Sequence, residues 1–446
     1  MRKIYILFAA LAILNTADAQ YSVSTYAGTG AAGLINGTLT TAQFTNSFGI
    51  CRDNSGTIYI ADNGNNCIRK ITTAGIVSTY AGSATAGYID GNATTALFNN
   101  PTGVCADDSG NVYVADFLNQ RIRKINTSGI VSTIAGSGVS GYNDGIGIAA
   151  QFNYPRGICI DHNYNIYVGD SWNHRIRKIT LNGNVTTYAG GGMSIGVGSI
   201  GAYIDAADTT ARFYTPCGVA VNDSGNVFVA DAYNHRIREI NTSRVVTTVI
   251  GSGATGVGMG GYGNGPALSA LLNVPTELFV DSAGNIYIGD TFNNRVRKMN
   301  NMSGMVINMA GNGTAGFVNG IDTLAEFNFP RGIIADNNGI VYVVDYNNNR
   351  VRMIAPFNAG TNDLYHNNSI NFYPNPASST IAIHQSTPST NQQLLITNIL
   401  GEEIYHQPIN NSTQITIDIS QWSNGVYFYQ IRNDKETLQG KFVVEK

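Results

Sequence analysis

Charged side chains are scarce in this chain. Only 12 % of its 446 residues are Asp, Glu, Lys or Arg, well below the roughly 25 % of ordinary soluble domains. The formal net charge is -3, so no global field would attract a polyanion or an anionic membrane, and composition gives no support for a nucleic-acid-binding protein. Asn, Ser, Thr and 51 Gly supply the polarity instead. This balance suits short strands joined by many turns.

Cysteine is also rare, with five residues in the chain. Cys51, Cys105 and Cys159 occupy the same place in successive sequence repeats. Equivalent positions of neighbouring repeats lie too far apart for the ~5.5 Å Cα spacing of a disulfide. We therefore expect these cysteines to be small apolar core residues with free thiols.

Long apolar runs are missing, apart from one near the start. Residues 4–14 form an apolar run behind a positively charged beginning, and Ala17 and Ala19 precede Gln20 as a small-x-small site. This pattern predicts a signal peptide over residues 1–19, cleaved before Gln20. The run is shorter than the ~20 residues that a bilayer requires, so we expect no transmembrane segment. The mature protein should be secreted or held at the outer cell surface.

One pattern dominates the rest of the chain. The stretch GNVYVADFLNQRIRKI from Gly110 recurs in six similar copies, whose central aspartates lie 54 to 61 residues apart. A fixed period in this range indicates stacked supersecondary units, each unable to bury its own hydrophobic face. The six aspartates are Asp62, Asp116, Asp170, Asp231, Asp290 and Asp345.

The first five units each carry four short segments with period-2 alternation, which is typical of a four-stranded propeller blade. The fourth segment reads VSTYAG at residues 77–82, and the sixth unit lacks it. An identical VSTYAG at residues 23–28 has no unit in front of it. We therefore predict an all-β, six-bladed propeller whose N-terminal strand completes the last blade and leaves no open edge at the seam.

A connector of about fifteen residues precedes each unit and ends in Ala-x-Phe at most positions, for example at Phe98. We expect this aromatic side chain to join neighbouring blades. The third and fourth connectors are longer and rich in glycine. They should elaborate one face of the ring.

The repeat resembles a known family. The string from Asn226 to Ile237 is similar to the NHL repeat, and the resemblance covers roughly residues 21–357. It implies a six-bladed propeller, in agreement with the count of units. It fixes no single function, because NHL propellers include protein-binding scaffolds, RNA-binding modules, sensor ectodomains and lyases.

The C-terminal part has a different character. Alternating segments such as QQLLITNIL and TQITIDI predict a small Ig-like β-sandwich over residues 369–446. Its opening FYPNPAS and its closing GVYFYQI and GKFVVEK resemble the C-terminal sorting domain of the type IX secretion system of Bacteroidota. The resemblance implies export by that machinery, followed by release or surface attachment. A carbohydrate-binding sandwich is the alternative. We thus expect a propeller over 20–357 and a linker over 358–368.

The aspartate of each repeat is followed by Asn three residues on and Arg five residues on, as in Asp116, Asn119 and Arg121. One interpretation is six ligand sites, and the other is a structural acceptor for turn N–H groups or for the arginine. Repetition favours the structural interpretation. Cys67 replaces the arginine in the first copy, which leaves the pairing of that blade open.

Histidine offers little for a metal site. His174 and His235 stand at the motif's own histidine position, and His162 follows an inner strand. One further imidazole cannot make a zinc site, which needs at least three protein ligands. The NHL-type amidating lyases and the gluconolactonase-like propellers use histidine or acid-and-amide sets that the inner strands do not offer. We assign no catalytic residue, metal ligand or cofactor.

Departures from the repeat mark a candidate binding site. One position at the start of each inner strand should face one mouth of the channel, and Glu277 replaces the glycine that follows it in copy five. Arg156 and Arg331 belong to copies three and six and should face each other, able to receive an anionic or polar group. The alternative is two solvated arginines and a local ion pair. The six positions are Phe48, Thr102, Arg156, Cys217, Thr276 and Arg331.

These patterns lead to one functional expectation. We expect a secreted or surface-attached NHL propeller that acts as a non-enzymatic binding module for an unidentified protein or glycan. The alternative is a propeller enzyme, a lyase or lactonase, with a divalent cation in the central channel. A metal whose binding depends on His162 or Glu277 would favour the enzyme.

Overall fold

The computed structural model describes residues 21–191, 202–356, 370–373, 377–385, 390–398, 402–409, 412–432 and 437–446. The chain forms two compact units that divide after Pro356, and each is described by itself. The expected signal-peptide site at Ala17, Ala19 and Gln20, the expected linker and part of the third connector lie outside the described residues.

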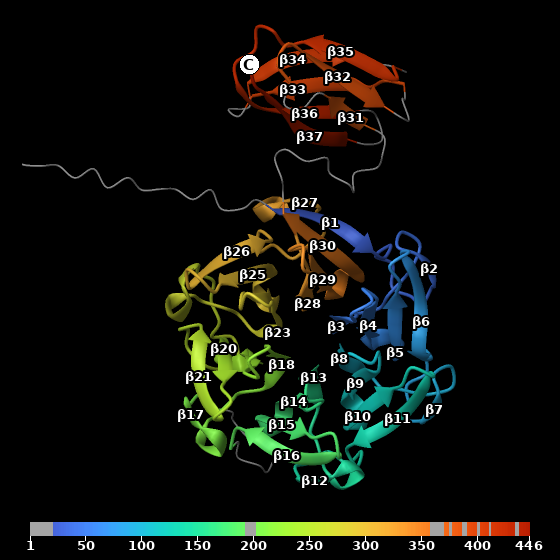
Figure 1. The fold of residues 1–446 in the computed structure, drawn as a ribbon, viewed down its shortest axis with the longest axis vertical. Coiled ribbons are helices and arrows are strands. Elements are labelled where there is room, and N and C mark those ends of the chain that lie inside the picture. The colour runs from blue at the N-terminus through green and yellow to red at the C-terminus, as the bar shows by residue number, and fades with distance from the viewer. Residues whose placement is uncertain are drawn as a thin grey trace, which may run out of the picture. The chain divides into compact units, whose positions relative to one another are not determined.

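The first unit is a ring of six blades around a central channel (Figure 1). Blade three shows the pattern, with β13 (Pro155–Ile160) innermost, followed outward by β14 (Ile166–Asp170), β15 (Arg175–Ile179) and β16 (Asn184–Ala189). A short strand of the preceding connector, β12 (Gly145–Ile146), lies on the outer edge. The strands are rich in Val, Ile and Tyr, which favour a pleated and half-buried surface.

The other blades repeat this order. From the channel outward, blade one contains β3 (Ile50–Arg52), β4 (Ile58–Asp62), β5 (Cys67–Ile71) and β6 (Ile76–Gly82), and blade two contains β8 (Pro101–Ala106), β9 (Val112–Asp116), β10 (Arg121–Ile125) and β11 (Ile130–Ala135). Blade four contains β18 (Pro216–Val221), β19 (Val227–Asp231), β20 (Arg236–Ile240) and β21 (Val245–Ile250), and blade five contains β23 (Pro275–Val280), β24 (Ile286–Asp290), β25 (Arg295–Asn300) and β26 (Met305–Ala310). Blade six contains β28 (Pro330–Ala335), β29 (Val341–Asp345) and β30 (Arg350–Pro356). Their short outermost strands are β2 (Gly37–Thr38), β7 (Gly91–Asn92), β17 (Ala206–Ala207), β22 (Gly265–Pro266) and β27 (Gly320–Ile321).

The N-terminal strand closes the ring. Strand β1 (Tyr21–Ala27) lies between β30 and β27 of the sixth blade, and Val23 pairs with Ile354 in antiparallel register. In Figure 1 the blue β1 runs beside the orange strands of that blade. The predicted all-β six-bladed propeller, with its N-terminal strand completing the last blade, is confirmed.

The hydrophobic cores lie between blades. Phe152, fully buried, belongs to a cluster that joins Ala115 and Ile122 of blade two to Val168 and other residues of blade three. Equivalent buried aromatics occupy the other interfaces, with Leu272 in their place before blade five. Each blade therefore buries its apolar face only against its neighbours. The aromatics at the other interfaces are Phe44, Phe98, Phe213 and Phe327.

The repeated aspartates hold buried arginines. Asp116 accepts a bond from Arg123 Nη1 at 2.6 Å, and both side chains are fully buried. The arginine thus lies seven residues after the aspartate, which corrects the expected partner Arg121; Arg121 donates to the carbonyls of Asn119 and Ser137 instead. The five equivalent pairs are Asp62–Arg69, Asp170–Arg177, Asp231–Arg238, Asp290–Arg297 and Asp345–Arg352.

The first blade is therefore complete. Arg69 Nη1 lies 3.0 Å from Asp62, and Cys67 leaves that pairing intact because the arginines at its position in the other blades donate to backbone carbonyls. The same carboxylate accepts the Thr45 N–H and the Asn65 amide. With at least three donors around each aspartate, the constellation is a structural support for the turn and the third strand.

The residue directly after the Asn of each Asp-x-x-Asn sequence joins one blade to the next. His174 Nδ1 accepts the backbone N–H of Thr215 at 3.0 Å, and His235 Nδ1 accepts that of Val274 at 3.1 Å. Side-chain oxygens of Asn or Gln do the same at the other four interfaces. These residues lie in the left-handed region, as do the partners whose N–H they accept. The donor and acceptor residues at those four interfaces are Asn46–Asn349, Asn100–Asn66, Tyr154–Gln120 and Phe329–Asn294.

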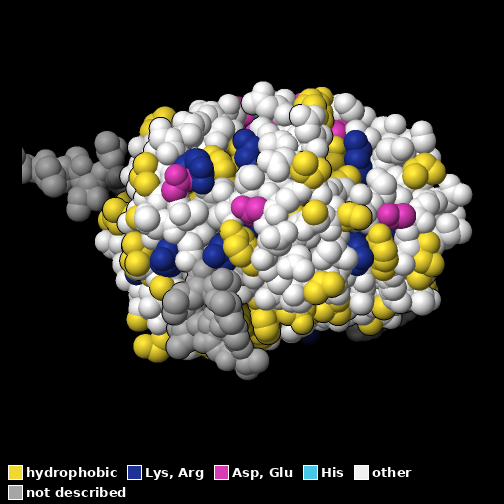
Figure 2. Space-filling model, turned by 90° about the horizontal axis from the view of Figure 1, so that it is seen from below, with side chains coloured by type: hydrophobic (Ala, Val, Ile, Leu, Met, Phe, Trp, Pro, Cys, Tyr) yellow, Lys and Arg dark blue, Asp and Glu magenta, His cyan; other side chains and the backbone are white. Residues whose placement is uncertain are grey.

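The outer wall of the ring carries few charges. Figure 2 shows basic and acidic side chains scattered among uncharged and hydrophobic ones on the side that it presents. Lys70, Lys124 and Lys178 come from the third strands of different blades. This spread gives the visible wall no basic patch of the kind that nucleic-acid binding requires.

The second unit is a small sandwich of two sheets. One contains β31 (Ile370–Tyr373), β32 (Thr380–Gln385) and β35 (Gln414–Asp418), and the other β33 (Gln393–Thr397), β34 (Glu403–Pro408), β36 (Gly425–Arg432) and β37 (Thr437–Val444). Trp422 packs against this core, 4.9 Å from the Tyr427 ring. No helix in the described ranges has the length and apolarity needed to cross a bilayer.

Candidate functional site: the central channel

The inner strands approach one another closely at one level of the channel. Five of them carry glycine there, and a Cβ at Gly157 would lie 2.5 Å from the Cys217 carbonyl oxygen of the next blade. β23 carries Glu277 at the same position. The Glu277 carboxylate reaches over Gly218, where a Cβ would lie 2.6 Å from it. A single side chain therefore enters the narrowest part of the channel.

Two arginines stand at one end of the channel, held by aromatic rings. The Arg331 guanidinium carbon lies 4.4 Å from the centre of the Phe48 ring and 3.9 Å from that of Tyr346. The Arg156 guanidinium carbon lies 5.9 Å from the centre of the same Phe48 ring. We call the group of Phe48, Arg156, Glu277, Arg331 and Tyr346 the arginine mouth. Cation–π contacts fix both guanidiniums while leaving their N–H edges available.

Charges in the arginine mouth are not directly paired. Among the described residues, no ion pair within 4.0 Å involves Arg156, Arg331 or Glu277. The Nε atoms of both arginines and Oε1 of Glu277 are buried without a hydrogen-bond partner. Arg156 Nη1 makes one contact, 3.7 Å from Cys217 Sγ. Two cations and one carboxyl group thus share a small space.

Burial changes the acidity of these groups. Desolvation raises the pKa of Glu277 to about 8, although the nearby guanidiniums of Arg156 and Arg331 lower it. Desolvation also lowers the pKa of Arg331 to about 10. At neutral pH the carboxyl group is therefore largely protonated, and the arginine mouth carries a net positive charge.

The structure brings the predicted mouth residues together but gives them different roles. Arg156, Arg331 and Glu277 are partly exposed, whereas Thr102 and Thr276 are only 2 % and 4 % exposed. Thr102 Oγ1 donates to the Arg156 carbonyl at 3.1 Å. Of the six positions predicted to face one mouth of the channel, four are therefore buried, and only Arg156 and Arg331 are partly exposed. The other two buried positions are Phe48 and Cys217.

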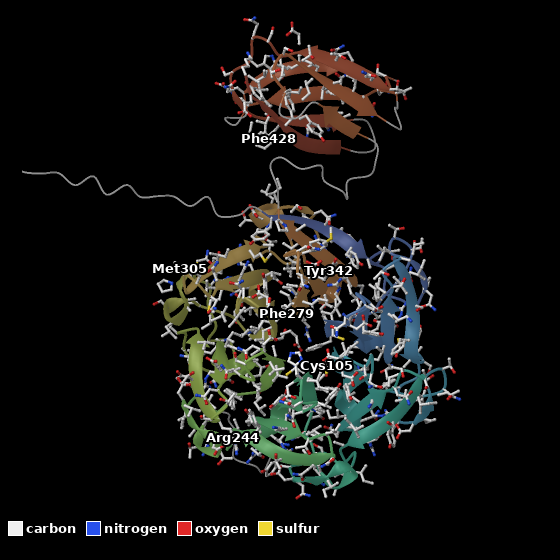
Figure 3. The ribbon with its side chains drawn as sticks, in the orientation of Figure 1. Cys105, Arg244, Phe279, Met305, Tyr342 and Phe428 are labelled. Carbon is white, nitrogen blue, oxygen red and sulfur yellow. The ribbon has the colours of Figure 1, made fainter. Side chains whose placement is uncertain are left out.

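Beyond Glu277 the channel widens into a cavity of ≈ 430 Å³. Cys51, Cys105 and Cys159 border it together with Phe279, so these cysteines line the channel rather than lying wholly within the core. Figure 3 labels Cys105 and Phe279 near the centre of the ring. The three thiols are free, and desolvation raises the pKa of each well above its usual value. They are therefore protonated and weakly nucleophilic.

Arg52, Asp53, Asn54 and Asn337, which follow the inner strands of blades one and six, also line this cavity. The exposed His162 lies 3.6 Å from Asp108 and 3.5 Å from Asp223 of the adjacent blades. Hydrogen bonding to Asp223 and Asp108 raises the pKa of His162. In the described part of the chain, no three His, Cys, Asp or Glu side chains form a group suited to a metal ion.

Aromatic side chains extend from Arg156 of the arginine mouth through Phe117 and Tyr154 to Trp172, and the sequence analysis missed them. Phe117 and Trp172 come from short 3₁₀ turns after the second strands, η2 (Phe117–Asn119) and η4 (Ser171–Asn173). Trp172 is 56 % exposed, and its ring lies 4.7 Å from that of Tyr154. The signal was present, because the second residue of these turns is large and apolar only in blades two to five: Leu118, Trp172, Tyr233 and Phe292.

The fourth connector reaches another of these 3₁₀ turns. The Gly256 N–H donates to the Tyr233 carbonyl at 2.7 Å, and His235 Nε2 lies 2.8 Å from the Gly256 carbonyl. Val257 and Met259, which follow in this connector, are 66 % and 55 % exposed. The fourth connector thus elaborates the face of the ring that carries the arginine mouth. The corresponding part of the third connector lies outside the described residues.

Two protein families match the chain. The NHL repeat matches residues 49–71, 98–125, 152–179, 213–240 and 327–352. The secretion system C-terminal sorting domain matches residues 371–445. The chain therefore contains NHL repeats and a C-terminal secretion sorting domain, and this domain implies secretion or surface attachment and an interaction with the secretion machinery.

Curated relatives share the propeller region. The chain is 27 % identical over 280 residues to the Arabidopsis thaliana protein SUPPRESSOR OF QUENCHING 1, chloroplastic, covering 60 % of this chain and 26 % of that one. It is 26 % identical over 330 residues to the Gallus gallus NHL repeat-containing protein 2, covering 68 % and 45 %. The chain thus spans less than half the length of either relative.

Solved structures share the fold. Two Bacteroides thetaiotaomicron proteins superpose with a TM-score of 0.56, at 19 % and 16 % identity, and each match covers 75 % of this chain and 76 % of the other. The first is described as a structural genomics protein of unknown function and the second as an auxiliary nutrient binding protein. At this identity the likeness shows the fold alone.

Proposed function

We propose that this exported propeller is a non-enzymatic binding module that receives an anionic group of its ligand in the arginine mouth. The observation that carries the proposal is the state of Arg156 and Arg331. Both guanidiniums are fixed by Phe48, and neither meets a carboxylate within ion-pair distance in the described structure. An arginine fork fits a carboxylate, sulfate or phosphate group with two parallel hydrogen bonds.

The proposal agrees with the remaining charges. Glu277, with its pKa raised to about 8, does not neutralise the two guanidiniums at neutral pH. An incoming anion would restore the charge balance and supply acceptors to buried N–H groups that lack them. The six fully buried arginines of the repeat bind aspartates, so Arg156 and Arg331 differ from these structural arginines.

The C-terminal sorting domain agrees with such a role outside the cell. One of the solved structures with the same fold is described as an auxiliary nutrient binding protein, and we extend only the class of role, capture of an external ligand, to this chain. Its ligand is a protein or a glycan in this proposal.

An enzyme remains the second candidate because of Glu277. A carboxyl group with a pKa of about 8 beside two arginines and a cavity is suited to general acid–base chemistry. A lyase or lactonase of this kind would use a divalent cation in the channel. Stoichiometric metal in the purified protein, lost in His162→Ala or Glu277→Ala together with turnover, would replace the binding proposal.

Calorimetry on the chain from Gln20 onward tests the binding proposal. The probes are sodium sulfate, sodium phosphate and D-glucuronate, which present the three oxyanion types. We expect at least one to bind, and R156Q/R331Q to weaken that binding by about tenfold or more, since charge-assisted hydrogen bonds are lost.

A matched variant controls for net charge. K124Q/K178Q removes two positive charges from third strands and leaves the channel unchanged, so its affinity should equal that of the parent chain. Equal affinity of R156Q/R331Q and the parent chain, or no binding of any probe, would contradict the proposal.

A further inference from the structure

We infer that the ligand is an acidic oligosaccharide, with one carboxylate in the arginine mouth and its sugar rings on an aromatic arc beside it. The aromatic arc consists of three ring pairs: Tyr154–Trp172, Tyr214–Tyr233 and Phe292–Phe329. This inference rests on the proposed function and names the class of ligand.

A continuous path of ring contacts leads from the arginine mouth to exposed tryptophan. The Arg156 guanidinium carbon lies 5.2 Å from the Phe117 ring centre, and Phe117 lies 4.9 Å from Tyr154. Tyr154 lies 4.7 Å from Trp172. Each step is comparable with the width of one sugar ring, so a saccharide anchored at Arg156 would cover the pair Tyr154–Trp172 with its next units.

The three ring pairs of the arc belong to consecutive blades, and the first and the last pair each have one exposed ring. Trp172 and Phe292 are 56 % and 48 % exposed. Tyr214 lies 5.3 Å from Tyr233 between them in the chain order, and Tyr214 contacts His174 of the preceding blade at 5.6 Å. Exposed aromatic faces carry partial negative charge and attract the weakly positive C–H groups on one face of a sugar ring.

Blades six and one supply amide side chains suited to the hydroxyl groups of the saccharide. Where blades two to five carry large apolar residues, these two carry Asn347 and Gly64. Asn347 is exposed, and its amide nitrogen donates to Asn328 Oδ1 at 3.0 Å. Asn63 and Asn100 form a similar amide pair at 3.2 Å. Amide groups both donate and accept hydrogen bonds, as sugar hydroxyls do.

A peptide ligand fits this face less well. Peptides commonly bind by adding a strand to an open sheet edge, and the inner-strand edges near the arginine mouth face the channel axis instead (Figure 1). Rings, amides and two guanidiniums match the three parts of a uronic acid chain, which are C–H faces, hydroxyl groups and carboxylates.

Intrinsic fluorescence provides the test, because Trp172 is the sole tryptophan of the propeller. The full chain from Gln20 onward is titrated with tri-galacturonate and with the methyl ester of the same trisaccharide. We expect tri-galacturonate to change the emission of Trp172 and to bind at least tenfold more tightly than its neutral ester. Trp172→Ala, followed by calorimetry, should weaken binding by about tenfold, corresponding to about 1.4 kcal/mol of aromatic contact.

Leu181→Ala is the matched control. Leu181 is 75 % exposed in the turn between β15 and β16, away from the aromatic arc, so its loss should leave the affinity unchanged. Circular dichroism establishes that both variants are folded before titration.

The outcomes separate the two proposals. If D-glucuronate binds through Arg156 and Arg331 but Trp172→Ala leaves tri-galacturonate affinity unchanged, the saccharide inference fails and the proposed function stands. If neither probe responds to R156Q/R331Q, both fail. Binding of a tripeptide carboxylate that depends on Trp172, without binding of tri-galacturonate, would overturn the saccharide class.

Discussion

The side-chain oxygen of Asn349 accepts the backbone N–H of Asn46 at 2.9 Å and thereby joins the last blade to the first. The two residues are 303 positions apart in the chain. Asn349→Ala should lower the free energy of unfolding of the propeller by about 1–3 kcal/mol, since it leaves a part-buried N–H without an acceptor. Thermal unfolding followed by circular dichroism measures this loss. Asn349→Gln, which copies Gln120 of blade two, should retain most of the stability.

Removal of the first strand should weaken the whole propeller. Deleting residues 20–28 takes away β1, which pairs with both β30 and β27, and leaves the sixth blade with an open edge. We expect a large fall in melting temperature and loss of cooperativity. A deletion variant that melts like the parent chain would show that the seam does not support the ring.

Loss of a buried arginine should be costly in any blade, including the first. Arg69→Met leaves the buried carboxylate of Asp62 without its cation, and such a change typically costs about 3–5 kcal/mol. Urea denaturation of the two proteins gives the difference. Arg121→Met is the matched control because Arg121 bonds only to carbonyl groups, and a loss as large as that of Arg69→Met would contradict the assigned pairing.

The interface histidine His235 makes stability depend on pH. Burial lowers the pKa of His235 below its usual 6.5, and protonation of its Nδ1 would remove the acceptor of the Val274 N–H. The folded protein therefore binds a proton less readily than the unfolded chain, and stability that is present above pH 6.5 falls as the pH drops below it. His235→Gln should reduce this fall, as measured by melting temperature between pH 8 and pH 5.

Binding of an anion in the arginine mouth should weaken in alkali. The pKa of Glu277 is about 8, so its carboxyl group becomes negative as the pH rises through that value and then competes for Arg156 and Arg331. We expect the affinity for tri-galacturonate to fall between pH 7 and pH 9, and Glu277→Gln to abolish this change. A parent chain with constant affinity over this range would contradict the assigned charge of Glu277.

The propeller could be predicted because its signals are repeated six times. Period-2 alternation, a fixed spacing and the orphan VSTYAG at residues 23–28 each depend on local sequence, and ring closure follows from counting. The partner of Asp116 was harder to assign, because two arginines, Arg121 and Arg123, follow it within seven residues. Only the fold shows that the third strand turns Arg123 inward and leaves Arg121 to cap the turn.

The channel could be predicted only in part. The repeat located Arg156 and Arg331 at one position of the inner strands and Glu277 at the next, but it did not show which neighbours would be buried. Thr102 turns into the interface because its hydroxyl finds carbonyl acceptors in the next blade. The exposure of Trp172 depends on how a 3₁₀ turn stands above the sheet, and a single sequence carries no direct signal for that.

The position of the seam also governs when the native state can form. Strand β1 is synthesised first, yet it pairs with β30, the last strand of the propeller, whose residues lie more than 300 positions later. Contacts of such high sequence separation are slow to form, because loop-closure entropy opposes them until most of the chain is present. A partly synthesised chain therefore cannot form a closed ring, and its blade edges stay exposed until the sixth blade has been synthesised.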